Sequence, residues 1–210
     1  MRFAELDAVT VDGYGTLIAL TGPVPALRDA LVRRGIERTD AEVAAAFTAE
    51  AAYYRPRAHL GRDDASLAEL RVECTGVFLA ALDAPIGAAD FADSFVSALM
   101  FEPVPGAVNA LADLRDRGLK LAVVANWDCA LSEHLEHLSL DAYFAEIVTS
   151  AEAGAPKPDP ASFRLALERL GVDSARALHV GDEQADELGA AAAGMRFAPA
   201  PLASAFEGWT

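Results

Sequence analysis

Short apolar runs alternate with longer stretches of helical periodicity near the start of the chain and again from residue 101 onward. The apolar runs have the length and composition of buried strands. They occupy residues 6–11, 119–125, 146–149, 177–180 and, more weakly, 195–198. Helical spacing covers 105–118 and 159–171, and each stretch ends on a glycine. The alternation predicts parallel pairing with right-handed crossovers, and therefore an α/β fold whose core is a three-layer, Rossmann-like parallel sheet.

Residues 18–100 break this rhythm. The segment shows amphipathic helical patterns at 25–35, 39–56, 66–82 and 88–100, and we find no convincing strand in it. The second pattern opens on the capping box Thr39-Asp40-Ala41-Glu42. We therefore predict an inserted all-α subdomain over 18–100, within a core built from 1–17 and 101–210.

The composition is that of a folded protein. Of 210 residues, 53% are hydrophobic and 23% charged, which suits one domain carrying a smaller insertion. Cys74 and Cys129 are too far apart for a zinc knuckle or a redox pair, so we expect buried thiols without a role. Two early acids interrupt the start, and nowhere does an apolar run reach membrane-spanning length, so the expected location is the cytoplasm.

Acidic residues outnumber basic ones by 32 to 17, which gives a net charge of -15. This excess argues against nucleic acid or an anionic membrane as a partner. A small phosphorylated substrate would need a bound cation and a positioned lysine to overcome the field of the whole molecule at short range. The oligomeric state, monomer or homodimer, stays open.

Polar residues follow the predicted strands at the positions where open parallel sheets bind ligands, the carboxyl ends of the strands. Four segments stand there or at a helix start: Asp12-Gly13-Tyr14-Gly15-Thr16-Leu17, Ala125-Asn126-Trp127-Asp128, Pro156-Lys157-Pro158-Asp159-Pro160 and Gly181-Asp182-Glu183-Gln184-Ala185-Asp186. Singly, each is explained as well by a turn or a helix cap. Together, in this order, they resemble the four motifs of the haloacid dehalogenase-like hydrolase superfamily. The resemblance implies that the helical insertion is a cap that closes over the site.

The resemblance assigns the reacting groups. It implies that Asp12 is a carboxylate nucleophile, which attacks phosphorus or carbon and holds the transferred group as an acyl phosphate or an ester. The Thr16 hydroxyl would donate to that group, and Lys157, held between two prolines, would balance its charge. The backbone N–H groups of Asn126 and Trp127, at a helix start expected to be capped by Asp128, would add donors.

The resemblance also implies a magnesium site. Asp12, the Tyr14 backbone carbonyl and Asp182 are the expected direct ligands, because Mg²⁺ takes oxygen donors and three crowded carboxylates would otherwise repel one another. Asp186 would either bind the ion directly or contact a group that does. We interpret the neighbouring Glu183 as a solvated helix start.

Two positions depart from the family pattern. Tyr14 stands where phosphatases of the family carry a second Asp as general acid and base, and the Asp-x-Tyr form is similar to 2-haloacid dehalogenases instead. Ala125 stands where the family has Ser or Thr, which removes a hydrogen bond of about 1.5 to 3 kcal/mol to the transferring group. Asn126 is a candidate partial substitute.

The remaining polar residues have weaker cases. Arg55 and Arg57 are substrate candidates in the insertion, together with Arg62, but a solvated helix end explains them equally well. This group also includes Tyr53, Tyr54 and His59. His134 and His137 are expected on a solvated helix face, and His179 as a hydrogen-bonded core residue.

Three functions follow, in this order. The first is a Mg²⁺-dependent phosphatase of a small phosphorylated metabolite, acting through an aspartyl-phosphate. The second is a 2-haloacid dehalogenase using the same nucleophile. The third is a weakly active or non-catalytic phosphate-binding protein, for which the substitutions at Tyr14 and Ala125 are the motive.

Overall fold

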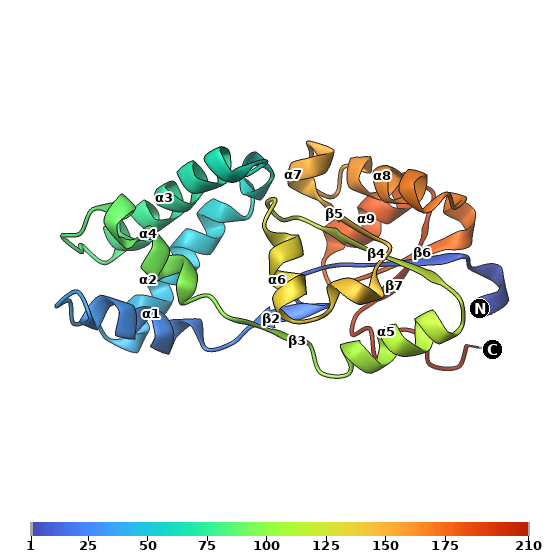
Figure 1. Cartoon of the computed structure of the whole chain (residues 1–210), viewed down its shortest axis with the longest axis horizontal. Helices are drawn as coiled ribbons and strands as arrows, with labels where there is room; N and C mark the ends of the chain where they lie inside the picture. The colour runs from blue at the N-terminus through green and yellow to red at the C-terminus, as the bar shows by residue number, and fades with distance from the viewer. Residues whose placement is uncertain (1, 210) are drawn as a thin grey trace. The chain divides into compact units, whose positions relative to one another are not determined.

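A computed structural model describes residues 2–209 and shows two compact units (Figure 1). One unit comprises Met1–Ala19 and Glu102–Thr210, and the other is Leu20–Phe101. The first contains the large sheet, and the second is helical. That the helical unit acts as a cap stays a prediction.

The large sheet is parallel throughout and has the strand order β5-β4-β1-β6-β7. Its strands are β1 (Ala8–Val11), β4 (Lys120–Ala125), β5 (Glu146–Thr149), β6 (Ala177–Gly181) and β7 (Arg196–Pro199). The central strand β1 is buried along its whole length and pairs with β4 on one side and β6 on the other. The prediction of a Rossmann-like parallel sheet is therefore confirmed, although β1 begins two residues later than the apolar run suggested.

Helices cover both faces of this sheet (Figure 1). On one face lie α8 (Ala161–Leu170) and α9 (Gln184–Ala192), and on the other α5 (Ala107–Asp116) and α6 (Leu131–His137). This is the arrangement that right-handed crossovers produce when the chain first winds outward from β1 and then returns across it. The core under α8 includes Ala122, Val124, Phe163, Leu167 and Leu170. Short elements complete the unit: α7 (Ser150–Ala153) and the 3₁₀ turns Phe3–Glu5, Asp141–Tyr143 and Ser174–Arg176.

The helical unit contains α1 (Pro23–Val32), α2 (Asp40–Tyr54), α3 (Asp64–Ala81), α4 (Ala88–Ser97) and the 3₁₀ turn Ala58–Leu60. The predicted capping box at the start of α2 is confirmed, with the Thr39 side chain accepting from the Glu42 N–H. A second box, formed by Asp63 and Ser66, begins α3. Phe78 centres the apolar interior, with its ring 5.0 Å from that of Phe95.

The prediction of no strand between residues 18 and 100 was wrong. The segment β2 (Ile18–Leu20) pairs with β3 (Phe101–Pro103) in a two-stranded sheet. Strands of three residues are too short to show the alternation by which a strand is recognised in a sequence. These strands lie where the chain leaves the large-sheet unit and where it returns.

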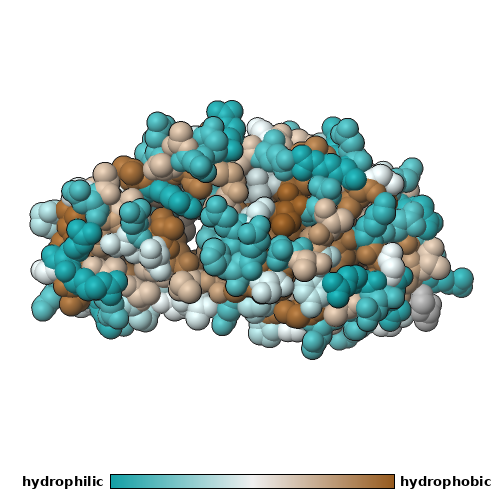
Figure 2. Space-filling model, in the orientation of Figure 1, coloured by the Kyte–Doolittle hydropathy of each residue, from teal (hydrophilic) through white to brown (hydrophobic). Residues whose placement is uncertain are grey.

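Hydrophilic side chains occupy much of the face shown in Figure 2, as the acidic composition leads one to expect. Within residues 2–209, none of the helices combines the length and the apolar character needed to cross a bilayer.

Candidate functional site

Asp12 lies directly after the central strand, at the carboxyl end of the sheet. Its N–H donates to the Val180 carbonyl at 2.9 Å, which extends the β1–β6 pairing by one residue. The chain then turns sharply at Gly15, which has φ +87°. This conformation favours glycine, and a Cβ at Gly15 would lie 2.4 Å from Oδ2 of Asp182 and would displace that carboxylate.

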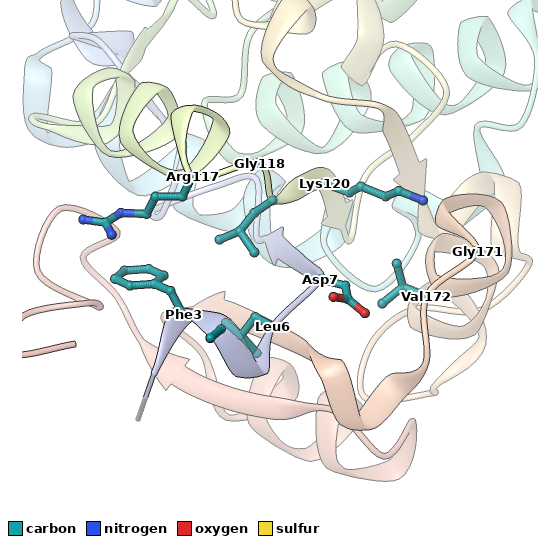
Figure 3. A pocket seen from close by; sticks show the side chains of 10 residues that line it. Phe3, Leu6, Asp7, Arg117, Gly118, Lys120, Gly171 and Val172 are labelled. Carbon is teal, nitrogen blue, oxygen red and sulfur yellow. The ribbon is translucent and has the colours of Figure 1, made fainter. Parts of the chain in front are cut away.

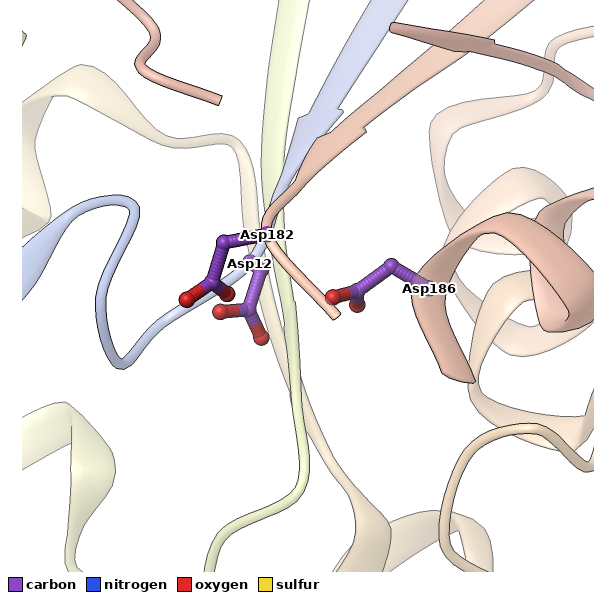
Figure 4. A group of neighbouring side chains, drawn as sticks. All are labelled: Asp12, Asp182 and Asp186. Atoms are coloured by element: carbon purple, nitrogen blue, oxygen red, sulfur yellow. The ribbon is translucent and has the colours of Figure 1, made fainter. Parts of the chain in front are cut away.

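Three carboxylates converge at this edge: Asp12, Asp182 and Asp186 (Figure 4). Asp182 follows β6, and Asp186 lies in the first turn of α9. Each offers an oxygen, and these oxygens lie within 4.8 Å of one another. Asp12 and Asp186 are buried, whereas Asp182 is exposed.

Lys157 places a buried ammonium group among these acids. Its Nζ donates to Oδ1 of Asp12 at 2.5 Å, to Oδ1 of Asp186 at 2.5 Å and to the Val124 carbonyl at 3.0 Å. An ammonium group has three N–H donors, so these partners fix its direction completely. The Asn126 side chain holds the lysine backbone on both sides, accepting from the Lys157 N–H at 2.6 Å and donating to its carbonyl at 3.2 Å.

The pKa values follow from burial and these contacts. Burial raises the pKa of Asp12 to about 7, with the charge of Asp186 acting in the same direction and Lys157 opposing both. Burial acts against ionisation of Asp186 as well, but the His179 hydrogen bond and the Lys157 charge bring its pKa down to about 2. Burial lowers the pKa of Lys157, yet the two carboxylates outweigh it and the net shift is upward. The lysine is therefore charged.

The donor set fits a hard divalent cation. Three carboxylates and one ammonium leave two unbalanced negative charges when all are ionised. Within the described chain, Asp182 has no hydrogen-bond partner on its carboxylate, Asp12 has one free oxygen, and the Tyr14 carbonyl accepts no backbone hydrogen bond. Carboxylate and carbonyl oxygens are the ligands that Mg²⁺ prefers. Both oxygens of Asp186, by contrast, already accept hydrogen bonds.

Thr16 supplies a second sign of a ligand. Its side chain is fully buried, and its hydroxyl has no hydrogen-bond partner among the described residues. A buried hydroxyl left without a partner costs free energy, so it calls for a physical explanation. Thr16 follows the turn that begins at Asp12, where a group attached to the aspartate would supply an acceptor.

The sequence pattern of the haloacid dehalogenase-like hydrolase family matches residues 6–194, which is most of the chain. The protein is a member of that family. The expected resemblance is therefore confirmed, and with it the assignment to a family of hydrolases.

Relatives of this haloacid dehalogenase-like hydrolase include "Haloacid dehalogenase-like hydrolase domain-containing protein 3" of Mus musculus, 44% identical over 49% of this chain and 41% of that protein. A phosphoglycolate phosphatase of Caulobacter vibrioides is 34% identical over 66% of this chain and 60% of its own length. The chain thus spans roughly half the length of the curated relatives that it matches. Among solved structures, L-2-haloacid dehalogenase of Xanthobacter autotrophicus matches with a TM-score of 0.66 and 27% identity, over 96% of this chain and 82% of that one.

Three expectations around the second motif need correction. The Trp127 N–H donates to the Ser150 hydroxyl at 3.1 Å, so it is not free to bind an anion. Asp128 accepts from the Ala130 N–H at 2.9 Å and closes a turn just before α6, rather than capping that helix. Asn126 uses its side chain on Lys157, so it does not replace the hydroxyl missing at Ala125.

Two residues near the site were missed as functional candidates. Ser150, whose hydroxyl also donates to the Trp127 carbonyl, has no distinguishing pattern in the sequence. His179 was expected to be buried and hydrogen bonded, and it is, but one of its partners is Asp186. That contact depends on the turn between β6 and α9, which residue types alone do not specify.

The substrate candidates in the helical unit form their own network. The Arg57 guanidinium lies 3.9 Å from the centre of the Tyr53 ring and donates to the Tyr53 carbonyl at 3.0 Å, while the Tyr53 hydroxyl donates to Glu73 at 3.0 Å. Arg55 directly follows α2. A substrate role for Arg55 and Arg57 stays a prediction.

The other candidates are placed as follows. Tyr14 is 41% exposed, at the turn beside Asp12. His137 is exposed as expected, but the His134 ring lies 5.9 Å from that of Trp127 and is only half-buried. Of the two thiols, Cys74 is buried and Cys129 is not fully so.

A hollow lies at the opposite, amino-terminal ends of the strands (Figure 3). It has a volume of about 520 Å³, and its lining includes Phe3, Asp7, Arg117 and Lys120. Its charged groups already have partners, since Asp7 pairs with Arg176 and Lys120 donates to the Leu170 carbonyl. Nothing in this lining corresponds to the carboxylate cluster.

Proposed function

We propose that the protein is a Mg²⁺-dependent phosphatase of a small phosphorylated metabolite, with Asp12 as nucleophile. The observation that carries the proposal is the buried Asp12 carboxylate, paired with Lys157 and flanked by Asp182 and Asp186. The unpartnered Thr16 hydroxyl supports a bound phosphoryl group beside it. The phosphatase named among its relatives supports the same reaction class.

The reaction has two balanced steps. In the first, the free Asp12 oxygen forms a bond to phosphorus, the ester P–O bond breaks, and the alcohol oxygen leaves with the electron pair and then takes a proton. In the second, water attacks phosphorus, a proton is lost, and inorganic phosphate leaves as the Asp12 carboxylate is restored. Lys157 offsets the charge of the carboxylate and the phosphoryl oxygens, and Thr16 donates a hydrogen bond to one of them.

Asp12, Asp182 and the Tyr14 carbonyl would hold the magnesium ion, because these three have free oxygen lone pairs. A bound Mg²⁺ neutralises charge on the phosphate oxygens. We assign Asp186 to orienting Lys157 rather than to direct ligation, because Lys157, His179 and the Glu183 N–H already occupy its oxygens.

The proposal includes three broader expectations. The helical unit would act as a cap that excludes water, which its insertion directly after the first motif supports. The protein would be cytoplasmic, as a monomer or homodimer. Its net charge of -15 supports the expectation that it binds neither nucleic acid nor an anionic membrane.

Phosphate release from a panel of phosphomonoesters tests the proposal. We expect turnover with Mg²⁺, none in excess chelator, and none in Asp12→Asn. Asp7→Asn is the matched control, since Asp7 directly precedes the same strand at its other end and pairs with Arg176 at the surface. Absence of Mg²⁺-dependent release across the panel, or release that persists in Asp12→Asn, would overturn the phosphatase proposal.

A 2-haloacid dehalogenase is the second candidate, and the Tyr14 position favours it, as does the match to a solved L-2-haloacid dehalogenase. There Asp12 would attack carbon, and halide would leave without needing a proton. Halide release from 2-chloropropionate that continues in chelator would support this candidate. Binding of Mg²⁺ and phosphate without turnover of either substrate class would instead favour a non-catalytic protein.

A further inference from the structure

His179 joins the active-site edge to the interior of the sheet. It lies on β6, is completely buried, and packs its ring edge-to-face against Phe163 with 4.8 Å between ring centres. Its Nδ1 lies 2.8 Å from the Thr10 hydroxyl on β1, and its Nε2 lies 3.1 Å from Oδ1 of Asp186 on α9. Both ring nitrogens therefore have a partner.

The partners determine where the ring proton lies. Both Asp186 oxygens accept from other N–H donors, one from Lys157 and one from the Glu183 N–H, so this carboxylate acts as an acceptor and Nε2 must carry the proton that it donates to Asp186. Burial lowers the pKa of His179 to about 4, so the ring is neutral and Nδ1 has no proton. The Thr10 hydroxyl then donates to Nδ1. The opposite tautomer would place a nitrogen lone pair against the carboxylate.

The chain of hydrogen bonds continues to the nucleophile. The same Asp186 oxygen that accepts from His179 also accepts from Lys157 at 2.5 Å, and Lys157 donates to Asp12. The Glu183 N–H holds the second Asp186 oxygen at 3.1 Å. Each oxygen of Asp186 is thus fixed, and so is the direction from which it holds the lysine.

We propose that His179 is a positioning residue for catalysis: held as the Nε2-protonated tautomer by Thr10, it fixes the Asp186 carboxylate that aims Lys157 at Asp12. The expected effect on catalysis rests on the proposed function, whereas the hydrogen-bond arrangement of His179 does not. Without the ring donor, Lys157 is the only partner left on Oδ1 of Asp186 among the described residues, so one of the three acceptors that direct the lysine is held less firmly. Displacing a group that orients a catalytic residue typically lowers activity by about 10- to 100-fold.

Three variants separate positioning from packing. His179→Gln keeps an N–H donor near the place of Nε2, His179→Leu fills space without one, and Thr10→Val removes only the hydroxyl that selects the tautomer. We expect His179→Leu to lower kcat by about 10- to 100-fold with a much smaller change in KM. His179→Gln should recover most of the loss, and Thr10→Val should fall between wild type and His179→Leu. Loss of folding alone would not lower kcat while leaving KM nearly unchanged, and His179→Gln would not recover activity lost in that way.

A second readout needs no turnover. Long-range ¹H–¹⁵N spectra of the labelled wild-type protein at pH 7.5 distinguish protonated from unprotonated ring nitrogens, with His137→Gln used to remove the signal of an exposed histidine. We expect the His179 ring to carry one proton, on Nε2, and Thr10→Val to shift the Nδ1 signal. A proton on Nδ1, or on both nitrogens, would overturn the proposal, as would a His179→Leu protein with wild-type kcat. If the wild type releases no phosphate, the phosphatase proposal fails while the spectrum still decides the tautomer.

Discussion

The Asp12 carboxylate lies where burial favours its neutral form, although the proposed attack on phosphorus requires it to be ionised. Its pKa of about 7 reflects this conflict, and Lys157 is the one cation that the described chain places against it. A cation bound between Asp12 and Asp182 would lower that pKa further. Binding of a cation there would therefore reduce the cost of ionising Asp12 in the folded protein.

Lys157→Met should lower the free energy of unfolding by an amount that depends on pH. Asp12 has a folded-state pKa above its ordinary value, so the stability of the fold falls as the pH rises from 3.8 to about 7 and levels off where Asp12 ionises in the folded protein as well. Without the lysine, we expect a loss of about 3–5 kcal/mol at pH 8, because buried charges are left unpaired, and a smaller loss at pH 6. Urea unfolding in chelator measures both.

Lys120→Met is the control for that measurement. Lys120 is exposed and its ammonium group donates to the Leu170 carbonyl, so its replacement should lower stability by about 1 kcal/mol, and by the same amount at both pH values. Equal losses of stability for Lys157→Met at pH 6 and pH 8 would contradict the raised pKa that burial gives Asp12.

Tyr14 should make turnover sensitive to the leaving group. No carboxylic acid occupies this position, so alkyl phosphates, whose oxygen needs a proton as it leaves, should react far more slowly than aryl phosphates with acidic phenols. Tyr14→Asp should raise kcat for an alkyl phosphate by about 100-fold or more and change aryl phosphate turnover much less. Equal rates for both classes in the wild type would show that another group supplies the proton.

At the scale of elements, the two capping boxes of the helical unit make separable contributions. Thr39→Ala and Asp63→Ala each remove a side-chain acceptor from an N–H in the first turn, at the starts of α2 and α3. We expect each to lower the free energy of unfolding by about 1 kcal/mol. Thermal and urea unfolding measure the loss.

Thr48→Ala is the matched control, an exposed threonine within α2 that bonds the Ala44 carbonyl. It should be neutral or slightly stabilising, since alanine has the higher helix propensity. A loss as large as that of Thr39→Ala would mean that capping is not the cause.

The sequence predicts the long elements well, because their physical signals are local. The five strands of the large sheet are apolar runs between helical patterns, and the capping box at Thr39 marks the start of α2. The strand β2 was missed because three residues carry no periodicity. The link from His179 to Asp186 was missed because it depends on where a turn directs one side chain.

At the scale of the molecule, the net charge of -15 opposes the approach of an anionic substrate. With Mg²⁺ held saturating, kcat/KM for a dianionic phosphate ester should therefore rise with ionic strength, as the Debye length shortens from about 30 Å at 0.01 M to about 8 Å at 0.15 M. A zwitterionic ester such as phosphocholine should respond less. A fall in kcat/KM with added salt would instead indicate that a positive local field dominates.

The central claim is that a phosphoryl group passes through Asp12. Rapid acid quench during turnover, followed by mass spectrometry of the peptides, tests it most directly. We predict one phosphoryl group on the peptide that contains Asp12, present only with substrate and Mg²⁺, lost in hydroxylamine as an acyl phosphate must be, and absent from Asp12→Asn. Steady phosphate release with the phosphoryl group on another residue, or undiminished release in Asp12→Asn, would contradict the account.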